Sequence, residues 1–114
     1  MSFFSKLFKT DNHKVITETK EYEYTIENAD KKELQKIFNT EFSIIDIYLR
    51  PYKNNTAIKV LNLKNDKIIG DIKEKDVAEI LSLGFKTGQI IVDNYINDEG
   101  LQVFKGTVLF KSHK

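Results

Sequence analysis

The feature that most constrains how this chain folds is a short alternating segment followed at once by a turn. Residues 56–63 (TAIKVLNL) alternate between apolar and polar side chains, which is typical of a half-buried β-strand. The polar run 64–67 (KNDK) then predicts a tight turn into a second short strand at residues 68–69. Gly70 indicates a bend, or a place where the backbone approaches another segment closely. The two strands therefore form a hairpin.

An amphipathic helix is predicted directly after this hairpin, at residues 74–83. Val77, Ile80 and Leu81 lie on one stripe, and Gly84 is suited to the position after the last turn. In the strand before the turn, the period of two separates the side chains onto two faces. We expect Ile58, Val60 and Asn62 on one face, and Ala57, Lys59, Leu61 and Leu63 on the other.

The same alternation predicts four more strands, and a second capped segment predicts one more helix. Asp30, with Glu33 three residues later, resembles a capping pair at the start of a helix that ends near Asn39. Pro51 is expected to end the strand before it, because proline has no N–H to donate to a ladder. The four strands lie at residues 15–26, 42–50, 89–96 and 101–110.

The predicted order of elements is β-α-β-β-β-α-β-β. Six short strands joined by hairpins indicate an antiparallel sheet that curls into a small barrel, since a flat sheet would leave edges to protect. The fold class is therefore α+β: a small, mainly antiparallel six-stranded β-barrel with two short helices. A chain of 114 residues has room for one such domain. We place it at residues 15–110, between an amphipathic and linker segment at 1–14 and a tail at 111–114.

Composition excludes several classes of function. The chain has no Cys, so disulfides, zinc–thiolate sites and cysteine nucleophiles are excluded. His13 and His113 are the only histidines, and both lie near the ends. There is no Gly-rich phosphate loop and no metal-binding cluster, so we predict no enzyme activity and no cofactor. No apolar run has the length of a membrane span and no signal peptide is visible, so we predict a cytoplasmic protein without a membrane partner.

Three motifs occur in order within residues 50–81. They are RPYKNNTAIKV at residues 50–60, KIIG at 67–70 and VAEIL at 77–81. Together they resemble the HIRAN domain family, in which an Arg-containing strand end and a polar loop precede an Ala-Ile-x-Val strand, an Ile-Gly step and a helix. The resemblance covers roughly a third of the chain and suggests a stand-alone HIRAN-like protein of bacteria or phages.

The resemblance implies an OB-like barrel that binds single-stranded DNA, including its 3′ end, in DNA repair or replication. It also implies helicase-like or nuclease partners. Arg50 is the only guanidinium, and its fork of donors suits a phosphate. Tyr52 would stack a base, and Asn54 and Asn55 would bond a sugar or a base edge. The candidate nucleic-acid-binding residues are Arg50, Tyr52, Lys53, Asn54, Asn55, Lys59, Lys31 and Lys32, with the last two expected to line the same groove.

Alternatives to each of these roles stay open. Arg50 pairs equally well with Asp46 or Glu41, and the two asparagines suit turn geometry alone. A further stacking aromatic is either Tyr95 or Phe104. The alternative function is a protein-interaction or assembly domain, such as a homodimer formed through an amphipathic N-terminal helix that carries Phe3, Phe4, Leu7 and Phe8.

Overall fold

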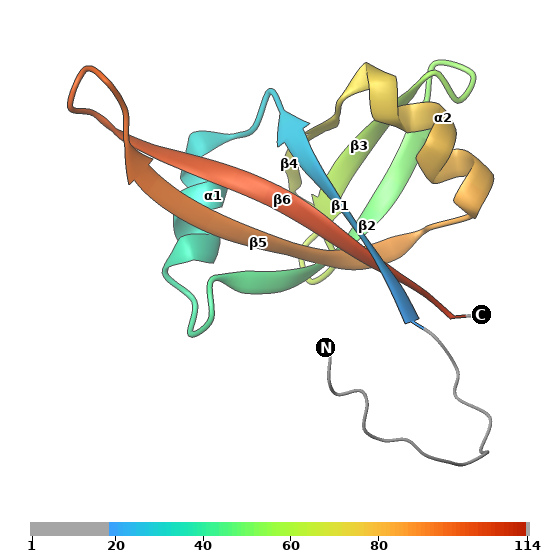
Figure 1. Ribbon diagram of the computed structural model, residues 1–114, viewed down its shortest axis with the longest axis horizontal. Helices are drawn as coiled ribbons and strands as arrows, with labels where there is room; N and C mark the ends of the chain where they lie inside the picture. The colour runs from blue at the N-terminus through green and yellow to red at the C-terminus, as the bar shows by residue number, and fades with distance from the viewer. Residues whose placement is uncertain (1–18, 114) are drawn as a thin grey trace, which may run out of the picture.

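The computed structural model describes residues 19–113, which form six strands and two helices (Figure 1). The order of elements confirms the predicted one. The expected helix at residues 1–10, the start of the strand at 15–26, and His13 lie outside the described residues. In chain order the elements are β1 Thr19–Glu27, α1 Lys31–Phe38, β2 Ile44–Tyr52, β3 Ala57–Asn62, β4 Ile68–Ile72, α2 Glu74–Leu83, β5 Thr87–Ile96 and β6 Gln102–His113.

The six strands close into a barrel in the order β1-β4-β3-β2-β5-β6, and every ladder is antiparallel. β1 pairs with β6 up to Thr25, which lies opposite Thr107. From Ile26 onward it pairs with β4 instead. This change of partner closes the sheet and confirms the predicted fold class, a small antiparallel barrel with two helices.

The barrel interior holds the apolar residues that the alternation assigns to inward faces. Phe110 is fully buried in this core and stacks on the partly buried Phe85, with their ring centroids 4.7 Å apart and their planes at 9°. Tyr24 lies against Phe110 at 6.0 Å, and its hydroxyl donates a hydrogen bond of 2.8 Å to Glu79 of α2. The other buried side chains include Ile26, Leu34, Ile37, Ile47, Leu49, Ile58, Val60, Ile69, Ile72, Val77, Ile80, Ile90, Val92 and Val108.

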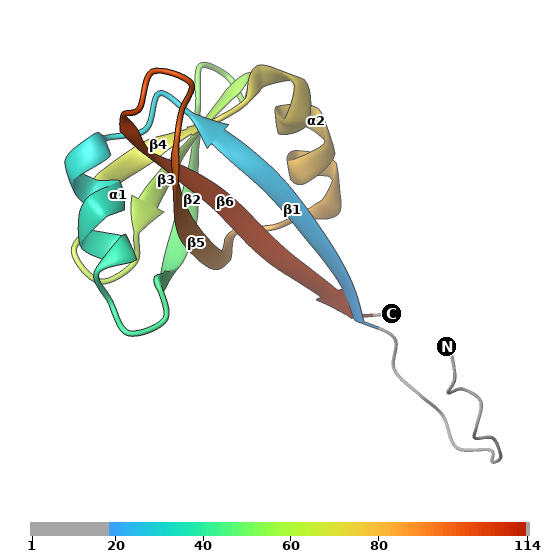
Figure 2. The same ribbon diagram turned by 60° about the vertical axis from the view of Figure 1, so that its left-hand side comes forward.

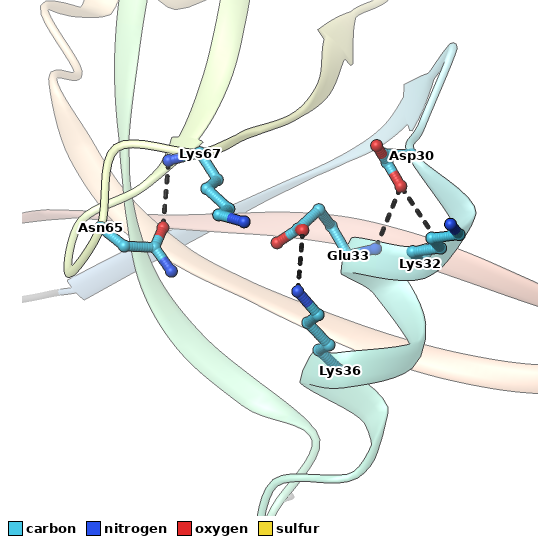
Figure 3. Close-up of polar contacts among 6 residues, drawn as sticks. All are labelled: Asp30, Lys32, Glu33, Lys36, Asn65 and Lys67. Carbon is cyan, nitrogen blue, oxygen red and sulfur yellow. Dashed lines mark hydrogen bonds and ion pairs between the residues drawn. The ribbon is translucent and has the colours of Figure 1, made fainter.

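Both helices begin and end close to the predicted positions. The Asp30 carboxylate caps α1 by accepting from the backbone N–H groups of Lys32 and Glu33 at 2.9 and 3.2 Å (Figure 3). Glu33 does not complete a capping box, because the N–H of Asp30 donates to the carbonyl of Ile69 at 2.8 Å and the Glu33 carboxylate pairs with Lys36 at 3.4 Å. Gly84 ends α2 in the left-handed conformation with φ of 78°, as expected of a glycine at that position.

The prediction that Pro51 ends its strand is wrong. β2 continues to Tyr52, and Pro51 lies opposite Ile58 of β3. The N–H of Leu49 donates to the carbonyl of Lys86 at 2.9 Å, so this edge of β2 faces β5. Backbone groups alternate along a strand, so the nitrogen of Pro51 lies on the same edge, just past the point where β5 leaves the ladder. Proline is tolerated there because no ladder bond is lost.

The two faces predicted for β3 are confirmed by its ladder with β2: Leu61 lies opposite Tyr48 and Lys59 opposite Arg50, on the outer side, where Leu61 is nevertheless fully buried. The register between β3 and β4 shifts between Val60 and Leu61, and both side chains are fully buried. The extra residue of this bulge is Ile69 of β4, because Val60 lies opposite Gly70 and Leu61 lies opposite Ile68. Lys59, which precedes the register shift, keeps its outward position and pairs with Asp71.

Gly70 lies inside β4, opposite Val60, where the backbone of another segment approaches closely. A Cβ atom at this position would lie 2.9 Å from Cδ1 of Ile26 and 3.1 Å from Cα of Ala29. Of the two roles expected for Gly70, the structure therefore supports close approach. At the other end of the barrel, β6 continues through His113, so residues 111–113 pair with β1 and do not form a tail.

The long β5–β6 hairpin extends past α1 as an arm, which is seen from two sides in Figures 1 and 2. α1 packs against β5 and β6, beside the turn that joins β3 to β4. The turn that joins β2 to β3 lies on the same side of the barrel as α2 (Figure 1). α1 therefore lies near one end of strands β2, β3 and β4, and α2 lies near the other end.

Candidate nucleic-acid interface

The outer face of the β2–β3 hairpin gathers most of the polar and aromatic residues that the sequence singles out. Tyr48, Arg50 and Tyr52 alternate with inward-facing residues along β2, so their side chains leave the barrel on the same side. Lys59 of β3 lies directly opposite Arg50 in the ladder. Lys53 follows at the start of the turn. We name this surface, Tyr48, Arg50, Tyr52, Lys53 and Lys59, the hairpin platform.

Tyr52 is the aromatic centre of the hairpin platform. The Nζ atom of Lys59 lies 5.1 Å from the centroid of its ring, and that of Lys53 lies 5.6 Å away. Both distances are in the range of cation–π contacts. A half-buried ring with two ammonium groups beside it can offer a stacking surface to a base and positive charge to the flanking phosphates.

Arg50 lies next to Tyr48 and is exposed to solvent. Its Nη2 atom donates to the Tyr48 hydroxyl at 3.1 Å, and that hydroxyl donates to Asp66 at 2.8 Å. The hydrogen bond to Asp66 raises the pKa of Tyr48. Within residues 19–113, Arg50 forms no ion pair with a carboxylate, so the alternative that pairs it with Asp46 or Glu41 is not observed. Its other N–H groups can therefore bind a ligand.

Lys59 differs from Arg50 because its charge is balanced. Its Nζ lies 2.9 Å from Oδ1 of Asp71, and the two side chains are 32% and 17% exposed. The approach to Oδ1 falls outside the angles of a directed hydrogen bond, so we describe the contact as an ion pair. This contact with Asp71 raises the pKa of Lys59. Arg50 and Lys53 are therefore the two cations of the hairpin platform whose charge no carboxylate of residues 19–113 offsets in an ion pair.

The β2–β3 turn holds three consecutive residues in the left-handed region. Lys53, Asn54 and Asn55 have φ of 53°, 54° and 65°, and the N–H of Thr56 donates to the carbonyl of Lys53 at 3.1 Å. Two central residues with positive φ make this a type I′ hairpin turn. Asparagine tolerates such angles well, so turn geometry accounts for both asparagines, while their exposed side chains remain free to reach a ligand.

Lys31 and Lys32 do not join the hairpin platform. They open α1, whose N-terminal cap is drawn in Figure 3 beside the β3–β4 turn that contains Asn65 and Lys67. Figure 1 shows α1 well separated from the β2–β3 turn. The expectation that these two lysines line the same groove as Arg50 is therefore wrong, because the crossing from β1 to β2 carries α1 onto β5 and β6.

Neither Tyr95 nor Phe104 adds a further stacking aromatic to the hairpin platform. Phe104 packs against Phe38, with 5.5 Å between ring centroids, whereas Tyr95 is half exposed on the β5–β6 arm. Both line a separate cleft of about 440 Å³ together with Lys73 and Lys105. None of the hairpin platform residues lines this cleft, so neither aromatic supplements Tyr52 directly.

Tyr48 was not selected as a site residue from the sequence, although its position carries a usable signal. It precedes Arg50 and Tyr52 at steps of two, so all three share one face of the strand. A polar aromatic on the same face as the only arginine is a candidate partner for the guanidinium, and the structure places the two in contact.

Comparison of the chain with models of protein families, with curated proteins and with solved structures finds no match. The resemblance to the HIRAN domain therefore stays a prediction. In the described part of the chain no helix is long and apolar enough to cross a membrane. Residues 19–113 also contain no group of three or more His, Cys, Asp or Glu side chains placed to hold a metal ion.

Proposed function

We propose that this protein is a non-catalytic module that binds single-stranded nucleic acid, with DNA favoured, through the hairpin platform. The observation that carries the proposal is the grouping of Tyr52 between Lys53 and Lys59, with Arg50 opposite Lys59. Stacking on an aromatic ring together with cationic contacts to the backbone is how proteins bind single strands with little sequence preference.

The position of the hairpin platform on the barrel supports this proposal. Small Greek-key barrels of the OB type bind oligonucleotides on the face formed by their second and third strands. The hairpin platform likewise lies on the outer face of two neighbouring strands, β2 and β3, of this six-stranded barrel. The likeness is one of architecture, so the residues themselves must supply the binding chemistry.

The charge of the hairpin platform predicts a moderate affinity for a single strand, and this affinity should fall only gradually as the salt concentration rises. Two cations without an ion-pair partner, Arg50 and Lys53, correspond to about two phosphate contacts. For a single strand, the slope of log K against log[salt] is then roughly −1.4, at about −0.7 per phosphate. We extend the proposal, on the HIRAN resemblance alone, to 3′-end capture, a helicase or nuclease partner, and a cytoplasmic role in DNA repair or replication.

The proposal is tested with a fluorescently labelled thymidine oligonucleotide at low salt, using anisotropy. Arg50→Ala should weaken binding roughly tenfold, because a charge-assisted contact to a phosphate is lost. Lys32→Ala removes the same charge from exposed α1 and serves as the matched control, which should bind nearly as wild type. Equal effects of the two substitutions, or no binding by the wild type, would refute the proposal. Strands with a 3′-hydroxyl or a 3′-phosphate test end capture separately.

A second candidate function, self-assembly, is favoured by the tip of the β5–β6 arm. Tyr95, Ile96 and Leu101 are 51%, 65% and 59% exposed there, on a hairpin that extends beyond the barrel. We propose that a second copy of the chain covers them if this function holds. Sedimentation equilibrium would then show a dimer that Ile96→Ser dissociates, whereas a monomer at all concentrations would exclude self-assembly.

A further inference from the structure

A cleft of about 340 Å³ opens between the end of β2 and the C-terminal turn of α2. Its lining includes Tyr48 and Pro51 of β2, Leu81 of α2, and Phe85, Lys86 and Thr87, which lead into β5. We name it the β2–α2 cleft. It is distinct from the outward surface of the hairpin platform, although the two share Tyr48.

The β2–α2 cleft exists because β5 leaves β2 before β2 ends. The ladder between them stops at Tyr48 and Thr87, and one further bond joins the N–H of Leu49 to Lys86. Beyond that point Pro51 has no N–H, and its carbonyl lies on the same edge of β2, toward the cleft. An exposed strand edge with an available acceptor therefore borders the cleft.

The lining suits a flat ring with a polar edge. Leu81 and Phe85 provide apolar surface, and Phe85 is held in place by stacking on Phe110. Polar groups stand at the rim, where Lys86 and Thr87 are exposed. An apolar slot with a few oriented polar groups is the usual form of a site for a small aromatic ligand.

The β2–α2 cleft and the hairpin platform share the C-terminal part of β2. Tyr48 lines the cleft, and its hydroxyl accepts from Arg50 at 3.1 Å. Pro51, which also lines the cleft, stands between Arg50 and Tyr52 in β2, so a phosphate held by Arg50 would lie beside the strand edge that borders the cleft. The distance from a phosphate to its own base is short, so a base of the same strand can reach the apolar lining.

We propose that the β2–α2 cleft is a nucleobase subsite, which takes one unpaired base of a strand whose phosphates lie on the hairpin platform. The inference rests on the proposed function. A base inside a duplex is stacked and paired, so it must be extruded before it can enter a protein pocket. The cleft would thus select single strands over duplexes, a preference that Arg50 and Lys53 alone do not provide.

The test compares a labelled thymidine strand with the same strand in which abasic sites replace the nucleotides. Both strands carry the same phosphates, so the ratio of their affinities isolates the contribution of the bases. Wild type should prefer the intact strand by about tenfold or more, where tenfold corresponds to about 1.4 kcal/mol. Leu81→Phe fills the cleft and should lower this preference at least threefold, with the affinity for the abasic strand unchanged.

Two further variants make the test decisive. Leu83→Phe carries the same substitution on α2, at an exposed residue that does not line the cleft, and should keep the full preference. Thr87→Phe blocks the cleft from an exposed rim position, so it replaces Leu81→Phe if that variant unfolds. A full preference in both blocking variants, while Arg50→Ala still weakens binding, would overturn the subsite and leave the hairpin platform. No binding of either strand by wild type would overturn both.

Discussion

The backbone conformation of Lys53 lowers the stability of the fold, whereas the charge of its side chain favours the proposed binding of a nucleic acid. Its φ of 53° lies in the left-handed region, where a residue with an ordinary Cβ is destabilised by about 1–2 kcal/mol. Asparagine is more tolerant, as at the two positions that follow. A lysine in this conformation places a charge beside the Tyr52 ring, which is the role that the proposed function gives to it.

Lys53→Asn should therefore raise stability and weaken binding at the same time. Relief of the left-handed lysine should increase the free energy of unfolding by about 0.5–1 kcal/mol, which chemical denaturation measures. Loss of the charge should lower the affinity for a single strand several-fold in an anisotropy titration. A variant that is more stable and binds as tightly as wild type would remove Lys53 from the hairpin platform.

Asp71→Asn should have the opposite effect on binding. The carboxylate offsets the charge of Lys59 at 2.9 Å, so its removal leaves a third free cation beside Tyr52. We expect single-strand affinity to rise about threefold at low salt, and stability to fall by about 1 kcal/mol as the partly exposed ion pair is lost. Asp98→Asn removes the same charge at the tip of the arm and is the control. Equal affinities in the two variants would contradict this role of Lys59.

Tyr24 gives a prediction for the scaffold that is independent of binding. Burial raises the pKa of its hydroxyl, and the hydrogen bond to Glu79 raises it further. The folded state thus holds the proton more tightly than the unfolded state, whose tyrosine titrates near 10. This stabilisation is fully present below about pH 10 and is lost as the pH rises toward the folded-state pKa.

Tyr24→Phe should lower the free energy of unfolding by about 1–2 kcal/mol at neutral pH, because a hydrogen bond to a carboxylate is lost. Denaturation of both proteins across alkaline pH should show this difference constant up to about pH 10 and narrowing above it. A difference that stays constant through pH 11 would contradict the assigned origin of the pKa shift.

Among the elements, β5 and β6 depend on Gly88 for their close pairing. A Cβ atom there would lie 2.5 Å from the carbonyl oxygen of Leu109 and 2.6 Å from Cδ1 of Phe110. Backbone cannot move aside easily, so Gly88→Ala should destabilise the protein by about 3 kcal/mol. Gly100→Ala is the comparison: it meets no atom within 4 Å, and its φ of 79° alone should give about 1 kcal/mol. Equal losses of stability in thermal unfolding would show that the close contacts at Gly88 do not determine the effect of its substitution.

The sequence predicts the elements well where one signal decides their position. Gly84 marks the end of α2, and the polar runs at 64–67 and 97–100 mark hairpin turns. The predictions from sequence are wrong where a neighbouring strand, and not a local motif, determines how far a strand extends. Pro51 stays inside β2 because β5 has already left that edge, and residues 111–113 extend β6 because β1 continues beside them. Neither arrangement has a local signature along the chain.

At the scale of the whole molecule, the hairpin platform was predictable only as far as it lies on two consecutive strands. Arg50, Tyr52 and Lys59 come together through the local β2–β3 ladder. Lys31 and Lys32 were misplaced because the position of α1 depends on the closure of the whole barrel. The β2–α2 cleft likewise requires that β5 and α2 be placed in three dimensions.

The central claim, that the hairpin platform binds a single strand, is tested most directly by mapping the contact on the protein. Amide chemical shifts of the ¹⁵N-labelled protein would be followed during titration with a thymidine oligonucleotide at low salt. We predict that saturable shifts concentrate in residues 48–60, with smaller changes near Lys86, and that α1 and the β5–β6 arm remain unaffected. Shifts confined to α1 or to the arm, or no shifts at all, would contradict the claim.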